Sequence, residues 1–439
     1  MPNPQDLLPS RRVGAALVAL LGLGIGLCGR PTGAAAQVLP VPHGGHEHPP
    51  AMTVSPRTLH AVAPAPAPAS TAPAAPAQIP VPAAGSPSAA TPLAPSEDPL
   101  VTPARMVEHP DHMPMESVAV AGRRLIAGGL NGVIILSDDN GATWHQVGLP
   151  VSTTITGISF TSDTTGWAIG HSGAVLHTLD GGEHWTLVYD GMRAAQATLA
   201  AARAANAADS VRSRKIDAAQ KLIARDKSRP FLLVQAASTG ITRLVGSDNL
   251  SVETDDGGRN WRPWSDAIDN PDGLPTYGIA QLHGITVIDG ERGLLLAGRP
   301  EDGLRALKSP FDGTWFGVID GGAQGVVIFG QQGHVYSADL AGDWQPGHEL
   351  AWRRIIDPST NTLTAGLQRQ DGSVLLADTS GATWWIHGKP EDARLVAGPV
   401  GATFPILAMV EAMDRSLILA GPGGVVRIPA PPAPAPASP

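Results

Sequence analysis

The sequence predicts an all-β fold, a seven-bladed β-propeller with one helical insertion between its second and third blades. Three observations support this prediction. A turn motif of fixed pattern recurs along the chain, a second turn marker divides the chain into seven units, and short apolar runs of strand length flank each marker. Regularly repeated units of four short strands are typical of propeller blades, whereas stacked β-sandwiches predict no fixed period.

The turn motif has the pattern Ser/Thr-x-Asp-x-Gly-x-x-Trp, which resembles the Asp-box of BNR-type propellers. It occurs at residues 137–144, 178–185 and 254–261, and residues 337–344 keep the serine, aspartate and tryptophan with the glycine displaced by one. The aspartate can accept hydrogen bonds from its own turn, the glycine can adopt positive φ, and the tryptophan can bury a large ring under the turn. We therefore assign a structural role to Ser137, Asp139, Gly141, Trp144, Thr178, Asp180, Gly182, Trp185, Thr254, Asp256, Gly258, Trp261, Ser337, Asp339 and Trp344.

The second marker is an apolar run followed by a turn of four residues. The seven turns are GLNG, GHSG, GSDN, GERG, GQQG, DTSG and GPGG, which end at Gly132, Gly173, Asn249, Gly293, Gly333, Gly381 and Gly424. Successive ends are 41, 76, 44, 40, 48 and 43 residues apart, so six intervals define seven units and one interval carries an insertion. Because strand-like runs flank each marker, these turns are predicted to close hairpins.

The sixth and seventh units depart from the common pattern. Residues 381–385 (GATWW) imitate the turn motif, but the marker spacing places Trp384 on a strand. The seventh unit is short of an outer strand, and residues 105–109 could supply it by pairing with the end of the chain. Such pairing would close the ring and cover two sheet edges.

Residues 192–229 form the insertion and are rich in alanine and basic residues. This composition favours helix, and Asp209 and Ser210 offer a cap in the middle, so we expect two helices or one interrupted helix. From Arg193 to Arg229 there are nine Arg or Lys residues and three Asp residues. The insertion is either a solvated helical hairpin against the propeller rim or a docking arm for an acidic partner or membrane surface. The candidate partner-binding residues are Arg212, Arg214, Lys215, Lys221 and Arg225.

The two ends of the chain differ from the repeats. Arg11 and Arg12, the apolar run 13–27 and the alanines at 34–36 form the pattern of a secretory signal peptide over residues 1–36, which predicts export to the periplasm or cell envelope by the Sec or the twin-arginine route. Residues 37–104 are a disordered linker rich in alanine and proline, residues 105–428 are the propeller, and residues 429–439 are a disordered tail. No membrane span is expected after signal removal.

Composition narrows the classes of function. The only cysteine, Cys28, lies in the predicted signal peptide, so we expect no disulfide and no cysteine-ligated metal in the mature chain. Whether Cys28 is lipidated is left open. The formal charge of −9 argues against nucleic-acid binding. His43, His46 and His48 are either a metal-binding tail or a polar tail. We expect no cofactor and no catalytic site.

Residues 270–280 (NPDGLPTYGIA) and 309–318 (SPFDGTWFGV) complete the pattern. With the turn motifs and markers, they resemble the photosystem II stability/assembly factor-like group of BNR propellers, in its non-photosynthetic bacterial branch, over most of residues 115–428. The resemblance implies an assembly scaffold without enzymatic chemistry, and it extends to exported relatives encoded near RND-type exporters. The expected function is a monomeric, exported scaffold or assembly factor that binds a protein of an envelope or membrane complex, such as an RND-type exporter.

A sialidase-like glycosidase or a carbohydrate-binding propeller is the alternative, because Asp-boxes also occur in these proteins. A sialidase needs a tyrosine nucleophile with a nearby carboxylate and an arginine cluster. Of the three tyrosines, Tyr189 and Tyr336 fall on outer strands, and Tyr277 opens an inner strand. A sugar binder would instead use exposed tryptophans such as Trp264, Trp315 or Trp385.

Overall fold

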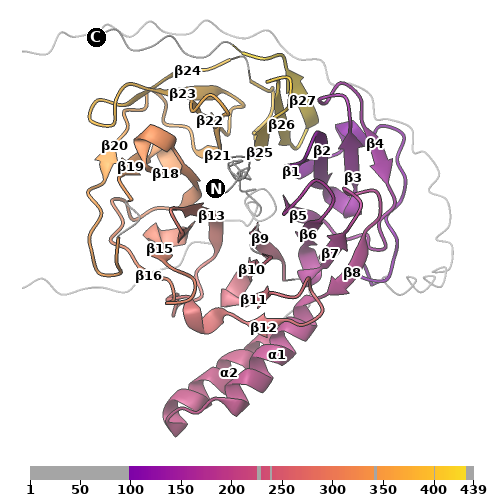
Figure 1. Ribbon diagram of the computed structural model, residues 1–439, viewed down its shortest axis with the longest axis vertical. Coiled ribbons are helices and arrows are strands. Elements are labelled where there is room, and N and C mark those ends of the chain that lie inside the picture. The colour runs from indigo at the N-terminus through magenta and orange to yellow at the C-terminus, as the bar shows by residue number, and fades with distance from the viewer. Residues whose placement is uncertain (1–97, 225–228, 238–239, 341–343, 400, 432–439) are drawn as a thin grey trace, which may run out of the picture. The chain divides into compact units, whose positions relative to one another are not determined.

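The computed structural model describes residues 98–224, 229–237, 240–340, 344–399 and 401–431. The predicted signal peptide, Cys28, the histidine-containing segment, residues 37–97 of the linker and residues 432–439 of the tail lie outside these residues. The fold is all-β and propeller-like, with seven antiparallel sheets that follow one another in chain order around a common centre (Figure 1). We number them sheets 1 to 7.

Each sheet is a meander in which consecutive strands pair, as alternating apolar segments joined by tight turns require. The strands of sheets 1 to 4 are β1 (Met115–Ala121), β2 (Arg124–Gly129), β3 (Ile134–Ser137), β4 (His145–Val147), β5 (Ile155–Phe160), β6 (Gly166–Gly170), β7 (Val175–Thr178), β8 (Thr186–Tyr189), β9 (Phe231–Ala236), β10 (Thr242–Gly246), β11 (Ser251–Thr254), β12 (Arg262–Pro263), β13 (Thr276–Leu282), β14 (Ile285–Gly290), β15 (Leu295–Gly298) and β16 (Arg305–Ala306). Those of sheets 5 to 7 are β17 (Trp315–Asp320), β18 (Val326–Gly330), β19 (Val335–Ala338), β20 (Arg353–Arg354), β21 (Leu363–Gln368), β22 (Val374–Asp378), β23 (Thr383–His387), β24 (Arg394–Ala397), β25 (Ala408–Glu411), β26 (Leu417–Gly421) and β27 (Gly424–Ile428).

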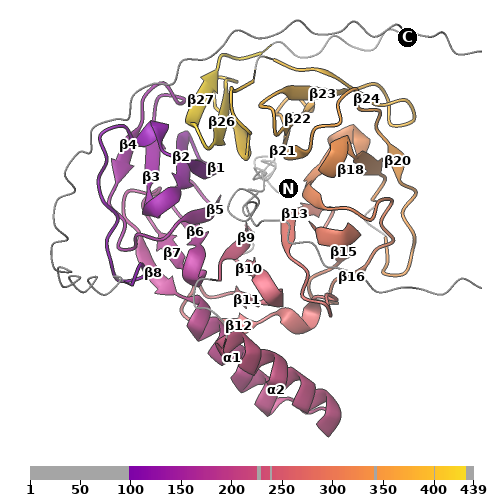
Figure 2. The ribbon, with the colours of Figure 1, turned by 180° about the vertical axis from the view of Figure 1, so that it is seen from behind.

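The first strand of every sheet lies toward the centre and contacts the first strand of the next sheet, and β25 of sheet 7 contacts β1 of sheet 1. Figure 2 shows the same closed order from behind. In sheets 1 to 6 the pairing between first and second strands shifts by one residue. Such a bulge bends the strand and redirects a side chain. The hydroxyls of two bulge residues, Thr156 and Thr364, donate hydrogen bonds of 2.6 Å to the backbone of the next sheet, at the carbonyls of Phe231 and Ile406.

The hydrophobic core is divided among the interfaces between sheets. One cluster of buried side chains fills each of the seven interfaces, including the one between sheets 7 and 1. Each sheet therefore buries both of its faces, which explains why its strands read as nearly continuous apolar runs rather than as alternating patterns.

The predicted insertion is a helical hairpin between sheets 2 and 3. It consists of α1 (Gly191–Ala204) and α2 (Asp209–Ala224), which pack on each other and project from the ring (Figure 1). Asp190 caps α1 by accepting a hydrogen bond of 2.9 Å from the backbone of Arg193. The chain leaves the helix after Ala204 and re-enters it at Asp209, so the insertion consists of two helices, one of the two forms expected. Asp209 is the first residue of α2 and contacts the side chain of Arg212 rather than the backbone of the first turn.

The outer edge of sheet 7 differs from the expectation. Residues 105–109 do not pair with β27, and sheet 7 has three strands among the described residues. The side-chain amide of Gln146 holds this segment on β4 instead: its Oε1 accepts from the amide of Val107 and its Nε2 donates to the carbonyl of Arg105, both at 2.9 Å. Pro110 then begins a 3-10 turn, η1 (Pro110–His112), which cannot continue a strand.

Residues 98–104, which precede the predicted propeller boundary at residue 105, also contact the ring. The carbonyl of Pro99 accepts a hydrogen bond of 2.9 Å from Ser152, and the amide of Ala104 donates one of 3.1 Å to Leu149. Residues 98–113 thus form a strap that runs from the sheet 1–sheet 2 connection across β4 to the start of β1.

Candidate protein-binding site

The three complete turn motifs share one hydrogen-bond arrangement. The Ser137, Thr178 or Thr254 hydroxyl donates to the motif aspartate at 2.8–2.9 Å and accepts from the motif glycine amide at 2.8–3.0 Å. The same aspartate oxygen accepts from the amide four residues later, at 2.9–3.0 Å. The second aspartate oxygen contacts the side chain of that later residue, which is Thr143, His184 or Asn260.

These contacts hold the motif carboxylates in their charged form. Hydrogen bonds from Thr143 lower the pKa of Asp139 to about 2, and hydrogen bonds from Asn260 do the same for Asp256. Burial opposes ionisation of Asp180, but the hydrogen bonds from His184 and Thr178 outweigh it and lower the pKa of Asp180 to about 2. Both oxygens of each carboxylate are therefore engaged in hydrogen bonds within their own turn and are not presented to a substrate.

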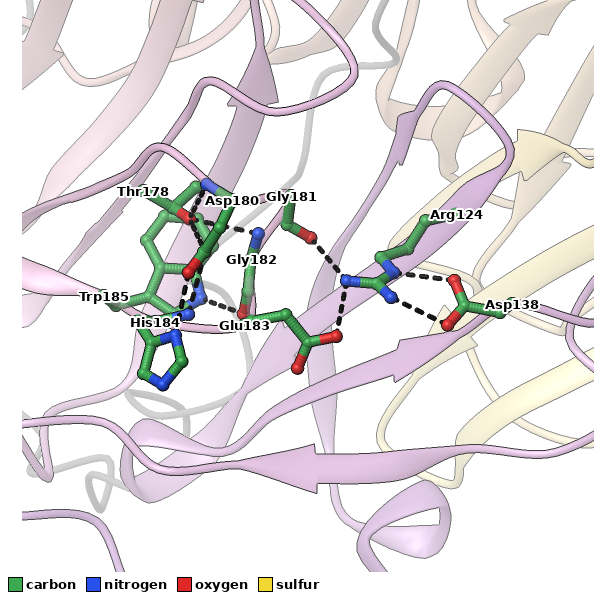
Figure 3. Close-up of polar contacts among 9 residues, drawn as sticks. All are labelled: Arg124, Asp138, Thr178, Asp180, Gly181, Gly182, Glu183, His184 and Trp185. Carbon is green, nitrogen blue, oxygen red and sulfur yellow. Dashed lines mark hydrogen bonds and ion pairs between the residues drawn. The ribbon is translucent and has the colours of Figure 1, made fainter.

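The second motif turn also connects two sheets (Figure 3). Arg124 of sheet 1 grips Asp138 through two hydrogen bonds of 2.7 and 2.8 Å. It reaches Glu183 at 2.8 Å and the carbonyl of Gly181 at 3.3 Å in the motif turn of sheet 2. Trp185 is buried below the turn and donates a hydrogen bond of 2.8 Å to the carbonyl of Gly182.

The fourth motif is built differently. Residues 341–343 lie outside the described residues, and within the described part of the chain the buried Ser337 hydroxyl has no hydrogen-bond partner. Asp339 is exposed, whereas Trp344 is buried and donates a hydrogen bond of 3.1 Å to the carbonyl of His348. Trp384 belongs to residues 381–385, the segment that imitates the turn motif. It lies on β23, as predicted, and its indole nitrogen donates a hydrogen bond of 3.0 Å to the carboxylate of Asp378.

The turn markers lie on one face of the ring, which we name the connection face because the links between successive sheets reach it as well. Five markers form 3-10 turns between second and third strands: η2 (Leu130–Gly132), η3 (His171–Gly173), η4 (Ser247–Asn249), η6 (Glu291–Gly293) and η8 (Gln331–Gly333). Their middle residues have φ between 50° and 58°. These residues, all polar, are Asn131, Ser172, Asp248, Arg292 and Gln332, one in each of sheets 1 to 5.

The helical hairpin leaves the ring from the connection face and projects outward past its edge (Figure 1). A Cβ on Gly173 of η3 would lie 2.4 Å from the Cα of Gly191, so α1 begins in direct contact with this turn. Buried Ala194, Ala195 and Ala219 and half-buried Leu222 fix the hairpin to itself and to the core between sheets 2 and 3. Lys215 of α2 reaches Asp266, in the 3-10 turn that follows β12 (Ser265–Ala267), at 2.7 Å.

The five candidate basic residues therefore fall into three groups: paired, exposed and outside the described residues. Arg212 pairs with Asp209 within α2, and Lys215 connects the hairpin to the turn that follows β12. Arg214 and Lys221 are exposed, whereas Arg225 lies outside the described residues. The anchored lysine is an attachment residue, and the two exposed side chains are the ones available to a partner.

The three tyrosines are buried or partly buried. Tyr189 stacks on Trp261 and Tyr336 packs edge-on against Trp315, which keeps both on outer layers. Tyr277 is a bulge residue of β13, 4% exposed, and donates a hydrogen bond of 2.8 Å to Glu291. Burial, followed by the Glu291 and Asp289 carboxylates, raises the pKa of Tyr277, so its phenol stays protonated.

The tryptophans named as sugar-stacking candidates are buried, which corrects the expectation that they are exposed. Trp264, Trp315 and Trp385 are 4%, 0% and 5% exposed. Each fills an interface between two sheets, and Arg243 and Arg369 lie over the rings of Trp264 and Trp385. Indoles needed for core packing are not available to stack on a sugar.

Sequence reasoning missed two carboxyl groups. Burial raises the pKa of Glu116, a bulge residue of β1, to about 7. Asp289 of β14 is fully buried, and burial raises its pKa well above the usual value even though a hydrogen bond from the backbone of Gly278 acts to lower it. The signal for Asp289 was available: the corresponding positions of the other sheets, each just before the last residue of the second strand, carry Gly, Ile, Val, Phe or Ala.

In the described ranges no group of three or more His, Cys, Asp or Glu side chains could hold a metal ion. Neither helix of the described chain has the length and apolarity needed to cross a bilayer.

Fold and site together define an all-β, propeller-like protein whose motif residues build turns and whose connection face carries a helical hairpin. Residues 125–199 match the family model of the photosynthesis system II assembly factor YCF48. The predicted resemblance to photosystem II stability/assembly factor-like propellers is thereby confirmed.

Solved structures agree on the fold. YCF48 from Cyanidioschyzon merolae is 14% identical with a TM-score of 0.54, and the match covers 74% of this chain and 98% of that one. A structure described as YCF48 bound to D1 peptide is 15% identical with a TM-score of 0.52, covering 76% and 98%. Comparison with the curated proteins gives no match.

Proposed function

We propose that this chain is a non-enzymatic, seven-bladed Asp-box propeller that binds a protein partner as a scaffold or assembly factor. The seven sheets are its blades, and the three motif turns are its Asp-boxes. The match of residues 125–199 to the YCF48 model carries the proposal. The related structure bound to a D1 peptide supports a protein as the class of ligand.

The proposed site of action is the cell envelope, where the partner belongs to a membrane or envelope complex such as an RND-type exporter. The signal-like start of the sequence supports export. The connection face supports docking, because its polar turns and helical hairpin are displayed on a rigid ring. Arg214 and Lys221, exposed on α2, favour an acidic surface on the partner.

Partner capture from envelope extracts tests this proposal. The tagged full chain is compared with a variant lacking residues 192–229 and with the double variant Arg214→Gln/Lys221→Gln. A matched control, Arg259→Gln/Lys389→Gln, removes two exposed cations elsewhere on the ring. We expect one set of envelope proteins with the full chain and the control, and its loss with the deletion and the hairpin variant. Equal recovery by all four proteins would reject the hairpin as docking arm, and no specific recovery would reject the scaffold.

A glycosidase remains the second candidate because Tyr277 does contact a carboxylate, Glu291. The charges that act on this phenol are carboxylates, which disfavour its ionised form, whereas a sialidase nucleophile needs arginines nearby. A fluorogenic sialoside assay decides between the two. Turnover that disappears in Tyr277→Phe and persists in Tyr336→Phe would replace the scaffold proposal with a catalytic one.

A further inference from the structure

We propose that the outer edge of β27 binds an extended segment of a protein partner, which adds to sheet 7 as its fourth strand and covers Trp144. This inference rests on the protein binding proposed above and names a surface for it. It follows from the repeated geometry of the ring.

The backbone of β27 offers hydrogen bonds on its outer side. The carbonyl of Ala420 accepts a hydrogen bond of 2.8 Å from Leu407 on the β25 side, so its pairing with Val425 across β26 and β27 is not hydrogen-bonded. The amide and carbonyl groups of Val425, and of Arg427 two residues later, therefore point away from β26. Within the described residues no strand pairs with this edge.

In sheets 1 and 2, an apolar side chain of the fourth strand packs in the same interface as the motif tryptophan of the next sheet. Val147 of β4 pairs with Ile134 and shares a core cluster with Trp185 of sheet 2. Tyr189 of β8 pairs with Val175 and stacks on Trp261 of sheet 3, with ring centroids 5.3 Å apart.

Val425 holds the position in sheet 7 that Ile134 and Val175 hold in sheets 1 and 2. Each of the three pairs with the residue just before the last residue of the second strand, namely Gly128, Ile169 or Ala420. Val425 packs in the core cluster between sheets 7 and 1 together with half-buried Trp144. That cluster contains no residue from a fourth strand.

The chemistry of the occupant follows from this equivalence. It must be extended, because backbone pairing with Val425 and Arg427 requires alternating outward groups. Opposite Val425 it must carry an aromatic or branched apolar side chain to cover Trp144, as Tyr189 covers Trp261. The outer strands β12, which pairs through two residues, and β8, which has four, indicate the length of the paired segment. The strap, residues 98–113, contacts β27 through η1, which lies against Gly424, the first residue of the strand.

A peptide copied from the chain itself is the probe. Acetyl-WTLVYD-amide reproduces residues 185–190, which include β8, and a second peptide replaces its tyrosine with serine. Amide hydrogen exchange of residues 417–431 is followed in the full purified chain with and without each peptide. We expect protection of residues 424–428 by the first peptide and binding weaker by about tenfold with the serine peptide.

Two variants separate edge pairing from nonspecific adhesion. Val425→Pro removes the outward amide without touching the β26 ladder, and Trp144→Leu keeps the backbone edge but removes the ring. We expect no protection in the first and weakened binding in the second, with the far-ultraviolet circular dichroism and the melting temperature of whichever variant is scored close to those of the parent.

Three results overturn the inference. One is absence of protection in the unmodified chain, and another is protection that survives both substitutions. The third is slow exchange at Val425 and Arg427 before any peptide is added, which means that the chain itself or a second copy occupies the edge. Because this assay uses purified protein, its failure leaves the envelope-capture result standing on its own.

Discussion

Arg427 in the last strand donates a hydrogen bond of 2.9 Å from Nε to the carbonyl of Asn140, which lies in the first motif turn. The same guanidinium pairs with Asp414 at 2.6 Å. Arg124 makes the equivalent contact one interface along, to the carbonyl of Gly181 in the second motif turn. At two interfaces, then, an arginine of one sheet donates a hydrogen bond to a backbone carbonyl in the motif turn of the next sheet. The Arg427 contact lies between sheets 7 and 1, so it connects the end of the ring to its beginning.

Replacing Arg427 with methionine should weaken ring closure. The substitution keeps an apolar stem of similar length and removes the contacts to Asn140 and Asp414, so we expect a loss of about 1 kcal/mol in the free energy of unfolding. Urea denaturation measures it. Arg394→Met, at an exposed position of β24, is the control and should stay within about 0.5 kcal/mol of the parent. A loss equal to that of the control would mean that Arg427 adds nothing to closure.

Gly258→Ala should be far more damaging than Gly257→Ala. Both glycines have positive φ, 84° and 74°, but a Cβ on Gly258 would lie 2.6 Å from Cη2 of Trp167, whereas one on Gly257 meets no atom within 4 Å. Backbone strain alone costs about 1 kcal/mol at Gly257, and strain with overpacking costs about 3 kcal/mol at Gly258. Denaturation midpoints of the two variants test this. Similar losses would show that the Trp167 side of the interface yields easily.

The motif aspartates should make the protein acid-sensitive. The pKa values of Asp139, Asp180 and Asp256 are lowered to about 2 in the folded chain, against about 3.9 in an unfolded one. Their contribution is present above about pH 4 and is lost as the pH falls toward 2. Asp139→Asn should flatten the decline of melting temperature between pH 4 and pH 2, whereas Asp302→Asn, in an exposed loop, should not. If the melting temperature of Asp139→Asn fell between pH 4 and pH 2 as steeply as that of the parent, the role given to these carboxylates would be contradicted.

Asp289 should have the opposite pH dependence. Because its pKa is raised in the folded state, stability is complete below about pH 4 and declines as the pH rises through the folded pKa. Asp289→Ala is expected to raise the melting temperature at pH 8 more than at pH 5, since alanine occupies the corresponding position, Ala420, of sheet 7. Scanning calorimetry at both pH values measures the difference. A lower melting temperature at pH 8 would mean that Asp289 has a partner that stabilises its charge.

Most of the architecture could be predicted because each unit repeats its local chemistry. The marker turns and the motif Ser/Thr, Asp and Gly residues satisfy hydrogen bonds within a few residues, so their spacing reports directly on hairpins. Trp384 was placed on its strand by the same spacing.

What failed depends on contacts distant in sequence. Residues 105–109 were expected beside β27, yet Gln146 on another strand decides their course. The burial of Trp264, Trp315 and Trp385 reflects which face of a strand meets the neighbouring sheet, and pattern alone cannot assign that face when both are covered. The buried Asp289 and the Tyr277–Glu291 contact arise likewise from packing between segments that carry no spacing signature.

Six of the seven junctions in the ring are crossed by the chain itself, but the junction of β1 with β25 and β26 is bridged by side chains and packing. That junction is the seam at which a thermal opening would start, because separation there leaves every peptide connection intact. Separation of the sheets at this junction would expose Trp144 and Val425 to solvent together. A segment bound across both residues would therefore stabilise the whole ring against opening.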